Sequence, residues 1–187
     1  METKETIHIN SKATRWLAAT LLLLTILALI WIVVFKCNEN NQLNISRNQA
    51  MSLWERFCYE LAPFKRVFEA IIGGSVVETL ALIFNVVCFI PLGALLRVFM
   101  GRRSAVLCGF GFTFAVEVFQ LFSGWGGFDF MDMLLNTLGA AIGAYAFGRL
   151  RGKISGRALN AVLVVSIAIA LPLDVYAVVN TINNFPV

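Results

Sequence analysis

Hydrophobic positions gather into five long windows along the chain, separated by short polar connections. The windows cover residues 16–35, 75–96, 104–122, 131–147 and 158–178. Each comes close to the roughly 20 apolar residues that a helix needs to cross the hydrocarbon core of a bilayer. The pattern predicts an all-α integral membrane protein, with about five transmembrane helices in a single membrane domain spanning residues 1–187.

The first window is expected to remain in the protein as an anchor. Its apolar run is too long for a usual signal-peptide core, and Lys36, Cys37 and Asn38 follow it instead of a small-residue cleavage site. Lys36 directly before Cys37 also argues against a lipoprotein.

Composition agrees with a membrane location. Hydrophobic residues make up 59% of the chain and charged residues only 14%, whereas soluble domains carry roughly a quarter charged residues. The mean hydropathy is +0.79. The chain therefore lies outside the soluble globular range.

Basic residues sort onto alternate connections. Ten of the fifteen precede the first window or lie in the second–third and fourth–fifth connections: Lys4, Lys12, Arg15, Arg97, Arg102, Arg103, Arg149, Arg151, Lys153 and Arg157. The positive-inside rule then places the N-terminus in the cytoplasm and the C-terminus outside. Because topology accounts for the basic residues, the net charge of +4 calls for no nucleic-acid partner.

Acidic and amide side chains interrupt three of the windows. We call them the polar cluster: Glu78, Asn85, Glu117, Gln120, Asp129, Asp132 and Asn136. Spacings of three, four or seven place the members of each window on one helical face. Under the predicted topology most lie toward the outer leaflet, with Asn85 near mid-depth. A charged side chain at the centre of a span costs on the order of 2.5–3.5 kcal/mol, so Glu117 should face the bundle interior.

A purely structural interpretation of these residues stays open. Asp129 could cap the fourth helix, with Asp132 at the third position of that helix. Glu117 could be protonated, or could bond Gln120, Asn136 or Asn85 across a helix interface.

Small residues after Asn136 predict a close helix contact. Gly139, Ala140 and Gly143 continue the same stripe, as in a small-xxx-small packing face. In the second window, Pro91 and Gly93 are expected to weaken or kink the inner end of the helix.

The long external segment has helical periodicity of its own. Hydrophobic residues recur between 51 and 72, with charged residues between them and an interruption at Pro63. We expect an external amphipathic helix lying at the interface. A lid packed on the bundle is the alternative, and Lys65 and Arg66 could meet a lipid phosphate.

Several kinds of chemistry lack candidates. His8 is the sole histidine and lies in the N-terminal tail, so histidine metal sites and Ser-His or Cys-His catalysis have no base. No phosphate loop or dinucleotide fingerprint is present. We therefore expect no cofactor and no metal. Cys37 and Cys58 are both external and could pair, but the sequence does not give their separation.

The ordered motifs resemble the VanZ-like family of bacterial membrane proteins. They are "NVVCFIPLG" from Asn85, "LAPFK" from Leu61, Glu117 with Gln120, Phe128 with Asp129 and Asp132, and "LLNTLGAAIG" from Leu134. The resemblance covers about residues 16–149. This chain has Gly126 and Gly127 where many members carry an arginine before the Phe-Asp pair.

The resemblance implies a multi-pass protein of the bacterial cell membrane whose name-giving relatives raise tolerance to the glycopeptide teicoplanin. It leaves three function classes. The first is an envelope factor whose partners are membrane lipids, lipid-linked wall precursors or the lipoglycopeptide itself. The second is an intramembrane enzyme using Glu117, Asp129 and Asp132 on a lipid phosphate. The third is a proton or cation transporter, ranked last because no internal repeat is visible.

Overall fold

The computed structural model describes residues 11–34, 49–59, 72–125 and 128–184. The described helices are α1 (Lys12–Val34), α3 (Leu53–Tyr59), α5 (Val76–Phe99), α6 (Arg102–Ser123), α7 (Phe130–Leu150) and α8 (Gly156–Asn184). Five of them, all except α3, are long and apolar enough to cross a membrane. The all-α multi-pass prediction is therefore confirmed.

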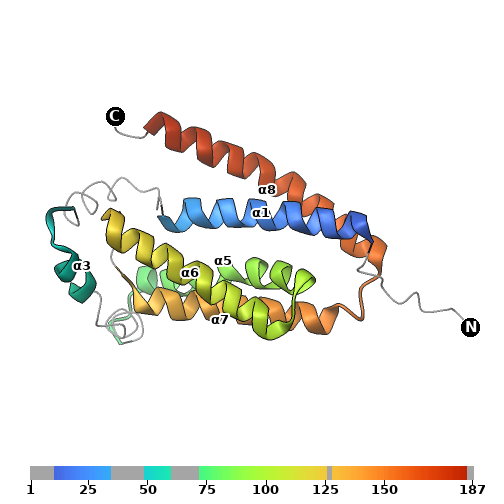
Figure 1. Cartoon of the computed structure of the whole chain (residues 1–187), viewed down its shortest axis with the longest axis horizontal. Helices are drawn as coiled ribbons and strands as arrows, with labels where there is room; N and C mark the ends of the chain where they lie inside the picture. The colour runs from blue at the N-terminus through green and yellow to red at the C-terminus, as the bar shows by residue number, and fades with distance from the viewer. Residues whose placement is uncertain (1–10, 35–48, 60–71, 126–127, 185–187) are drawn as a thin grey trace, which may run out of the picture.

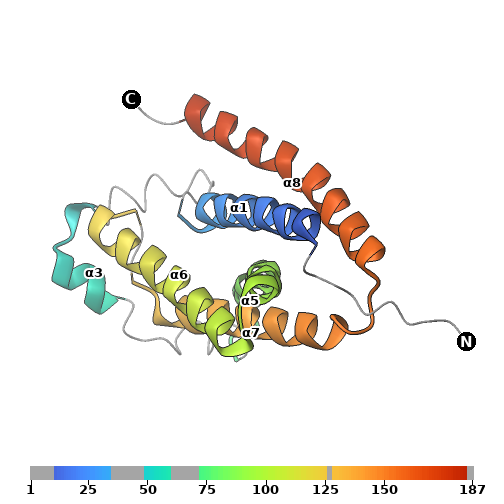
Figure 2. The same cartoon turned by 45° about the vertical axis from the view of Figure 1, so that its right-hand side comes forward.

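Successive spans point in opposite senses (Figure 1), and α5 is inclined to α1, α6 and α7, so that it is seen nearly end-on in Figure 2. The N-terminal end of α1, the α5–α6 connection and the α7–α8 connection share one end of the bundle, and this end carries most of the basic residues. The outer ends of α6 and α8 lie at the opposite end. Most basic residues thus lie at one end of the bundle, as the positive-inside rule expects of a membrane protein. That this end faces the cytoplasm stays a prediction.

The tightest contact of the bundle joins α5 to α7. Glycine is required there because a Cβ atom at Gly139 would overlap the backbone carbonyl of Val86, and one at Gly143 would overlap that of Ile90. Gly93 of α5 belongs to the same contact, because a Cβ atom there would overlap the carbonyl of Ala140 in α7. The backbones touch directly, as expected for small-residue packing in a membrane.

Helix α5 continues through Pro91. Proline has no N–H and cannot bond the carbonyl four residues earlier, at Val87. The helix persists because the contact with α7 holds its backbone on both sides of the proline, through Val86 and Ile90 before it and Gly93 after it.

Two hydrophobic clusters complete the packing. The larger cluster joins four spans: Leu29 and Val33 of α1, Phe89, Leu92 and Leu96 of α5, Ala105 and Val116 of α6, and Ala144 of α7. The smaller one joins Ala18 of α1 and Leu95 of α5 to Leu159 and Leu163 of α8. Helix α1 thus lies between α8 and the rest of the bundle, as Figure 2 shows.

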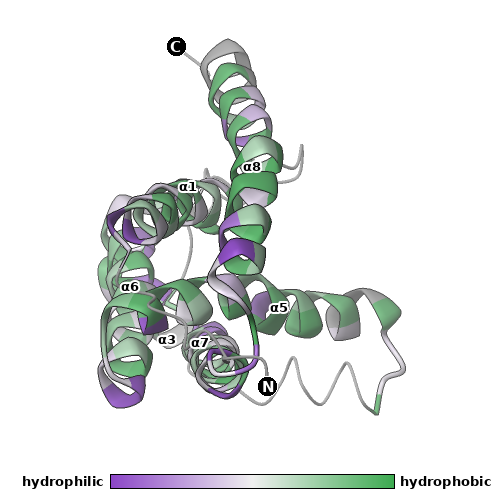
Figure 3. Cartoon of the chain, turned by 90° about the vertical axis from the view of Figure 1, so that its right-hand side faces the viewer, coloured by the Kyte–Doolittle hydropathy of each residue, from purple (hydrophilic) through white to green (hydrophobic). Residues whose placement is uncertain are grey.

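Most of the surface of α8 is apolar and exposed. Its extended side chains include Val162, Leu173 and Tyr176, each at least 60% exposed. Figure 3 shows α8 outside the group formed by α1, α5, α6 and α7, with hydrophobic residues along most of its length. In a bilayer this surface faces lipid.

The short helix α3 docks on the outer end of α6. It begins with a capping box, in which the Ser52 N–H donates to Glu55 Oε2 at 2.7 Å and the Glu55 N–H donates to Ser52 Oγ at 3.3 Å. These bonds lower the pKa of Glu55, so the cap is lost as the pH falls through that lowered value. Arg56 Nη1 donates to the Leu121 carbonyl at 2.7 Å, in the last turn of α6.

This contact bears on the expected external amphipathic helix. α3 covers residues 53–59 of the predicted stretch and packs on the bundle, as in the lid alternative. Residues 60–71, with Lys65 and Arg66, lie outside the described part of the chain.

Replacing Gly143 by alanine should destabilise the protein, since the added Cβ has no space against the Ile90 carbonyl. The matched change Gly111→Ala on α6 meets nothing within 4 Å. It should be neutral or slightly stabilising, by up to about 1 kcal/mol, because alanine favours helix over glycine. Thermal unfolding in detergent measures both. Equal stabilities would contradict the close α5–α7 contact.

Candidate functional site

Asp129 caps the start of α7. Its Oδ1 accepts from the backbone N–H of Met131 at 2.8 Å and from that of Asp132 at 3.1 Å. The backbone at Asp129 is extended, as an N-cap requires. A carboxylate at this position also meets the positive end of the helix dipole. The capping role considered for Asp129 is therefore present.

Glu117 of α6 reaches the same turn. Its Oε2 accepts from the backbone N–H of Asp129 at 2.8 Å, and its side chain is only 1% exposed. The bond ties the outer end of α6 to the N-terminus of α7. Asp129 thus donates its backbone N–H to the Glu117 carboxylate, while its own carboxylate caps α7.

Asp132 adds a link to a third helix. Asn85 Nδ2 of α5 donates a short hydrogen bond to Asp132 Oδ1. Asp132 is 4% exposed and lies one turn into α7. Carboxylates and amides from α5, α6 and α7 therefore meet at the end of the bundle opposite the arginine-rich connections.

The two remaining amides bind elsewhere. Gln120 Nε2 donates to the Val33 carbonyl of α1 at 2.9 Å. Asn136 Nδ2 donates to Thr113 Oγ1 of α6 at 2.9 Å. The Asn136 Oδ1 is buried and has no hydrogen-bond partner among the described residues, so this level of the bundle holds an acceptor still able to take a proton donor.

These contacts assign partners that helical spacing did not. Gln120, Asn136 and Asn85 were possible partners of Glu117, and each donates a hydrogen bond to another group. Glu117 accepts from the backbone N–H of Asp129, which helical spacing did not suggest. The side chain of Glu78 lies outside the description, so its place in the cluster stays a prediction.

Three buried polar residues escaped the sequence analysis: Thr14, Thr113 and Asp174. Thr14 of α1 donates to Asn160 Oδ1 of α8 at 2.7 Å. Thr113, fully buried, completes the bond of Asn136. Asp174 lies on α8 and is 8% exposed, and its Oδ2 has no hydrogen-bond partner in the described chain. The signal for Asp174 was present, since it is the single acid inside the last apolar window. It belongs to α8, which packs mainly on α1, and so it is not part of the polar cluster.

The site concentrates acidic side chains in a place that water barely reaches. Glu117, Asp129 and Asp132 are each at most 8% exposed. Burying carboxylates is costly unless hydrogen bonds or opposite charges compensate. Backbone N–H groups and an amide supply part of that compensation, so the arrangement suits holding a donor-rich or cationic group, or a shared proton. No three His, Cys, Asp or Glu side chains in the described segments are grouped as metal ligands.

A series of aromatic rings runs from α3 to α6 through Phe128, next to the cap residue Asp129. They form the aromatic row, in which neighbouring centroids lie 5.7–6.5 Å apart: Trp54, Phe57, Phe128, Phe114 and Phe110. Phe128 precedes the cap residue Asp129, and the row continues down α6 through two exposed phenylalanines. The aromatic row therefore connects the docked helix α3 to exposed rings on α6.

Comparison with known proteins finds a matching family model and a similar protein. The family model described as VanZ/LLP1 matches residues 22–151. Protein VanZ of Enterococcus faecium is 30% identical over 165 residues, which cover 86% of this chain and 92% of that protein.

The chain belongs to the VanZ-like family.

The matched segment of this VanZ-like protein runs from within α1 to the end of α7. It contains every described member of the polar cluster and the glycine contact beneath it, and it ends before α8. No solved structure matches the chain significantly.

Glu117→Leu and Glu117→Gln should separate the two parts of the Glu117 interaction. Leucine leaves the buried Asp129 N–H without its acceptor, at a cost of about 1–3 kcal/mol. Glutamine keeps an acceptor oxygen and should retain most of the stability. Thermal unfolding of the purified variants measures the difference, and equal losses would show that the bond to Asp129 contributes little.

Proposed function

We propose that this VanZ-like protein lowers sensitivity to teicoplanin-type lipoglycopeptides. In this proposal it binds the drug, or the lipid-linked wall precursor that the drug attacks, at the outer face of the membrane. Family membership supports a teicoplanin-resistance-type function in general terms. The binding step is our inference from the polar cluster and the aromatic row.

The observation that carries the proposal is the convergence of three buried carboxylates from α6 and α7 with Asn85 of α5. Helix capping accounts for Asp129, but it does not require Glu117 or the bonded pair of Asp132 and Asn85. A neutral side chain at 117 or 132 would hold the helices together at a lower desolvation cost. Retaining charge there is better explained by a ligand that carries donors or positive charge.

The aromatic row supports an amphiphilic ligand. Lipoglycopeptides and lipid-linked precursors each combine a polar body with a hydrocarbon chain. The polar body would meet the acidic residues, while the chain would lie along Phe114 and Phe110, whose rings are exposed on α6. The docked helix α3 adds Trp54 and Phe57 at the head of the same path.

A susceptibility test separates this role from a structural one. In a host lacking the gene, we expect Glu117→Gln and Asp132→Asn to lose teicoplanin tolerance while reaching normal membrane levels. Each keeps side-chain shape and hydrogen-bonding capacity but removes the negative charge. Vancomycin serves as the comparison drug because it lacks the acyl chain.

The matched control is Glu55→Gln, an exposed acid on α3 outside the polar cluster. It should leave teicoplanin tolerance unchanged. Full tolerance in both cluster variants would remove the charges from the mechanism. A second assay incubates the purified protein with lipid-linked precursors, and a new product that requires Asp129 or Asp132 would establish an enzyme in place of a binding factor.

A further inference from the structure

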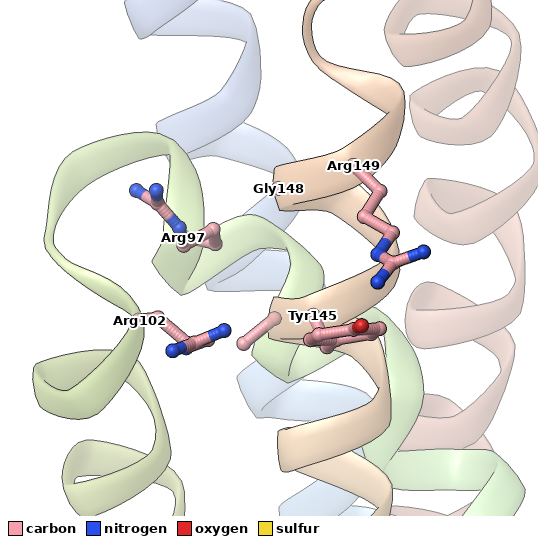
Figure 4. A pocket seen from close by; sticks show the side chains of 6 residues that line it. Arg97, Arg102, Tyr145, Gly148 and Arg149 are labelled. Carbon is pink, nitrogen blue, oxygen red and sulfur yellow. The ribbon is translucent and has the colours of Figure 1, made fainter.

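A cavity of about 450 Å³ opens at the end of the bundle opposite the polar cluster. Its lining comes from the end of α5, the start of α6 and the end of α7: Arg97, Arg102, Ala144, Tyr145, Gly148 and Arg149. We call it the arginine cavity. Ligand pockets in proteins occupy roughly 300–1,000 Å³, so a small headgroup fits this one. Figure 4 shows Arg102 and Arg149 extending toward the Tyr145 ring.

No acidic residue lies near the cavity arginines along the sequence. No Asp or Glu occurs between Glu78 and Glu117, or between Asp132 and Asp174. Arg149 lies 4.7 Å from the centroid of Tyr145 and Arg102 lies 5.9 Å from it. Two guanidinium groups that share one ring repel each other, and an anion between them would offset that repulsion.

Donors without acceptors point to the same kind of ligand. Arg97 Nη1 donates to the Met100 carbonyl at 2.9 Å, but its Nε is buried and has no partner among the described residues. That Nε faces α7, within 3.6 Å of where a Gly148 Cβ would lie. Helix α6 begins beside the cavity, and no side chain caps its N-terminus at Gly101. Free N–H groups at a helix start favour an anion.

Apolar residues on α7 lead from the hydrocarbon region to the cavity. Leu138, Ile142, Tyr145 and Arg149 follow spacings of four, three and four, which place them in one stripe along the helix. Leu138 and Ile142 are 50% and 42% exposed. This stripe could carry an acyl chain while the arginines hold its phosphate, a combination that a soluble anion would not need.

We propose that the arginine cavity binds the phosphate headgroup of an anionic membrane lipid. Arg102 and Arg149 hold the phosphate oxygens, Arg97 Nε supplies a further donor, and the acyl chain lies along Ile142 and Leu138. The positive-inside rule explains why arginines occur at this end of the molecule. It does not explain why three of them, from three helices, line one cavity, two of them beside the ring of Tyr145.

The test measures lipid binding by the full-length protein purified in neutral detergent. Native mass spectrometry with phosphatidylglycerol and phosphatidylcholine gives apparent dissociation constants. We expect a preference for phosphatidylglycerol. In this proposal both arginines donate hydrogen bonds directly to the charged phosphate, and losing one such bond weakens binding about tenfold, so the Arg102→Gln, Arg149→Gln pair should weaken it at least about tenfold.

The matched control is the Arg103→Gln, Arg157→Gln pair, which removes the same charge from exposed positions at the same end. It should change binding less than about twofold, because neither residue lines the cavity. Equal loss in both pairs would reduce the effect to diffuse surface charge and overturn the proposal. So would the absence of a phosphatidylglycerol preference.

Two further measurements distinguish a loss of binding from a loss of folding, and a lipid ligand from a soluble phosphate. If the glutamine pair unfolds, Arg102→Lys with Arg149→Lys keeps the charge but loses the planar donor geometry. This pair should keep its thermal stability and bind phosphatidylglycerol more weakly than the wild type, and unchanged binding would refute the assigned geometry. Millimolar inorganic phosphate should not displace the lipid, and full displacement would assign the cavity to a soluble phosphate.

Discussion

The direct backbone contact between α5 and α7 is the constraint on which the rest of the bundle depends. At three glycines, Gly93, Gly139 and Gly143, the facing backbone leaves no space even for a Cβ atom. Hydrocarbon tails are as apolar as leucine, so burial of hydrophobic residues gives little drive for helices to associate in a membrane. Close approach through small residues supplies the van der Waals contact that replaces this drive. It also carries α5 through Pro91 as a continuous helix.

Fixing α7 against α5 determines where the polar groups lie. Asp132 is about two turns before Gly139 on α7 and meets Asn85 across the same interface. The cap at Asp129 then starts α7 where Glu117 of α6 can accept its backbone N–H. The position of the acidic residues is therefore a consequence of backbone packing, and the proposed ligand would meet them at an interface that the glycines already hold together. This is why the cluster can be buried without any basic side chain of α5, α6 or α7 at its end of the bundle.

The sequence predicted the features that depend on one helix at a time. Apolar window length gave the five spans, Asp129 with Asp132 gave a cap, and Gly139 with Gly143 gave a packing face. Hydrogen-bond partners could not be predicted in this way. The helical period shows which face of a helix a residue occupies, but not which residue of the next helix lies at the same depth. Gln120 donates to the Val33 carbonyl, and Asn136 donates to Thr113. Threonine is common in spans, so Thr113 did not stand out as a partner in the sequence. The arginine cavity was equally hidden, since topology alone explained Arg97, Arg102 and Arg149.

Helix α7 carries Asp129 and Asp132 at its first turn and Tyr145 and Arg149 near its last. It thus connects the acidic site to the arginine cavity as one rigid rod that spans the membrane. The glycine contact with α5 lies between these two ends, so a substitution that displaced the helix there would shift the acidic residues and the arginines together.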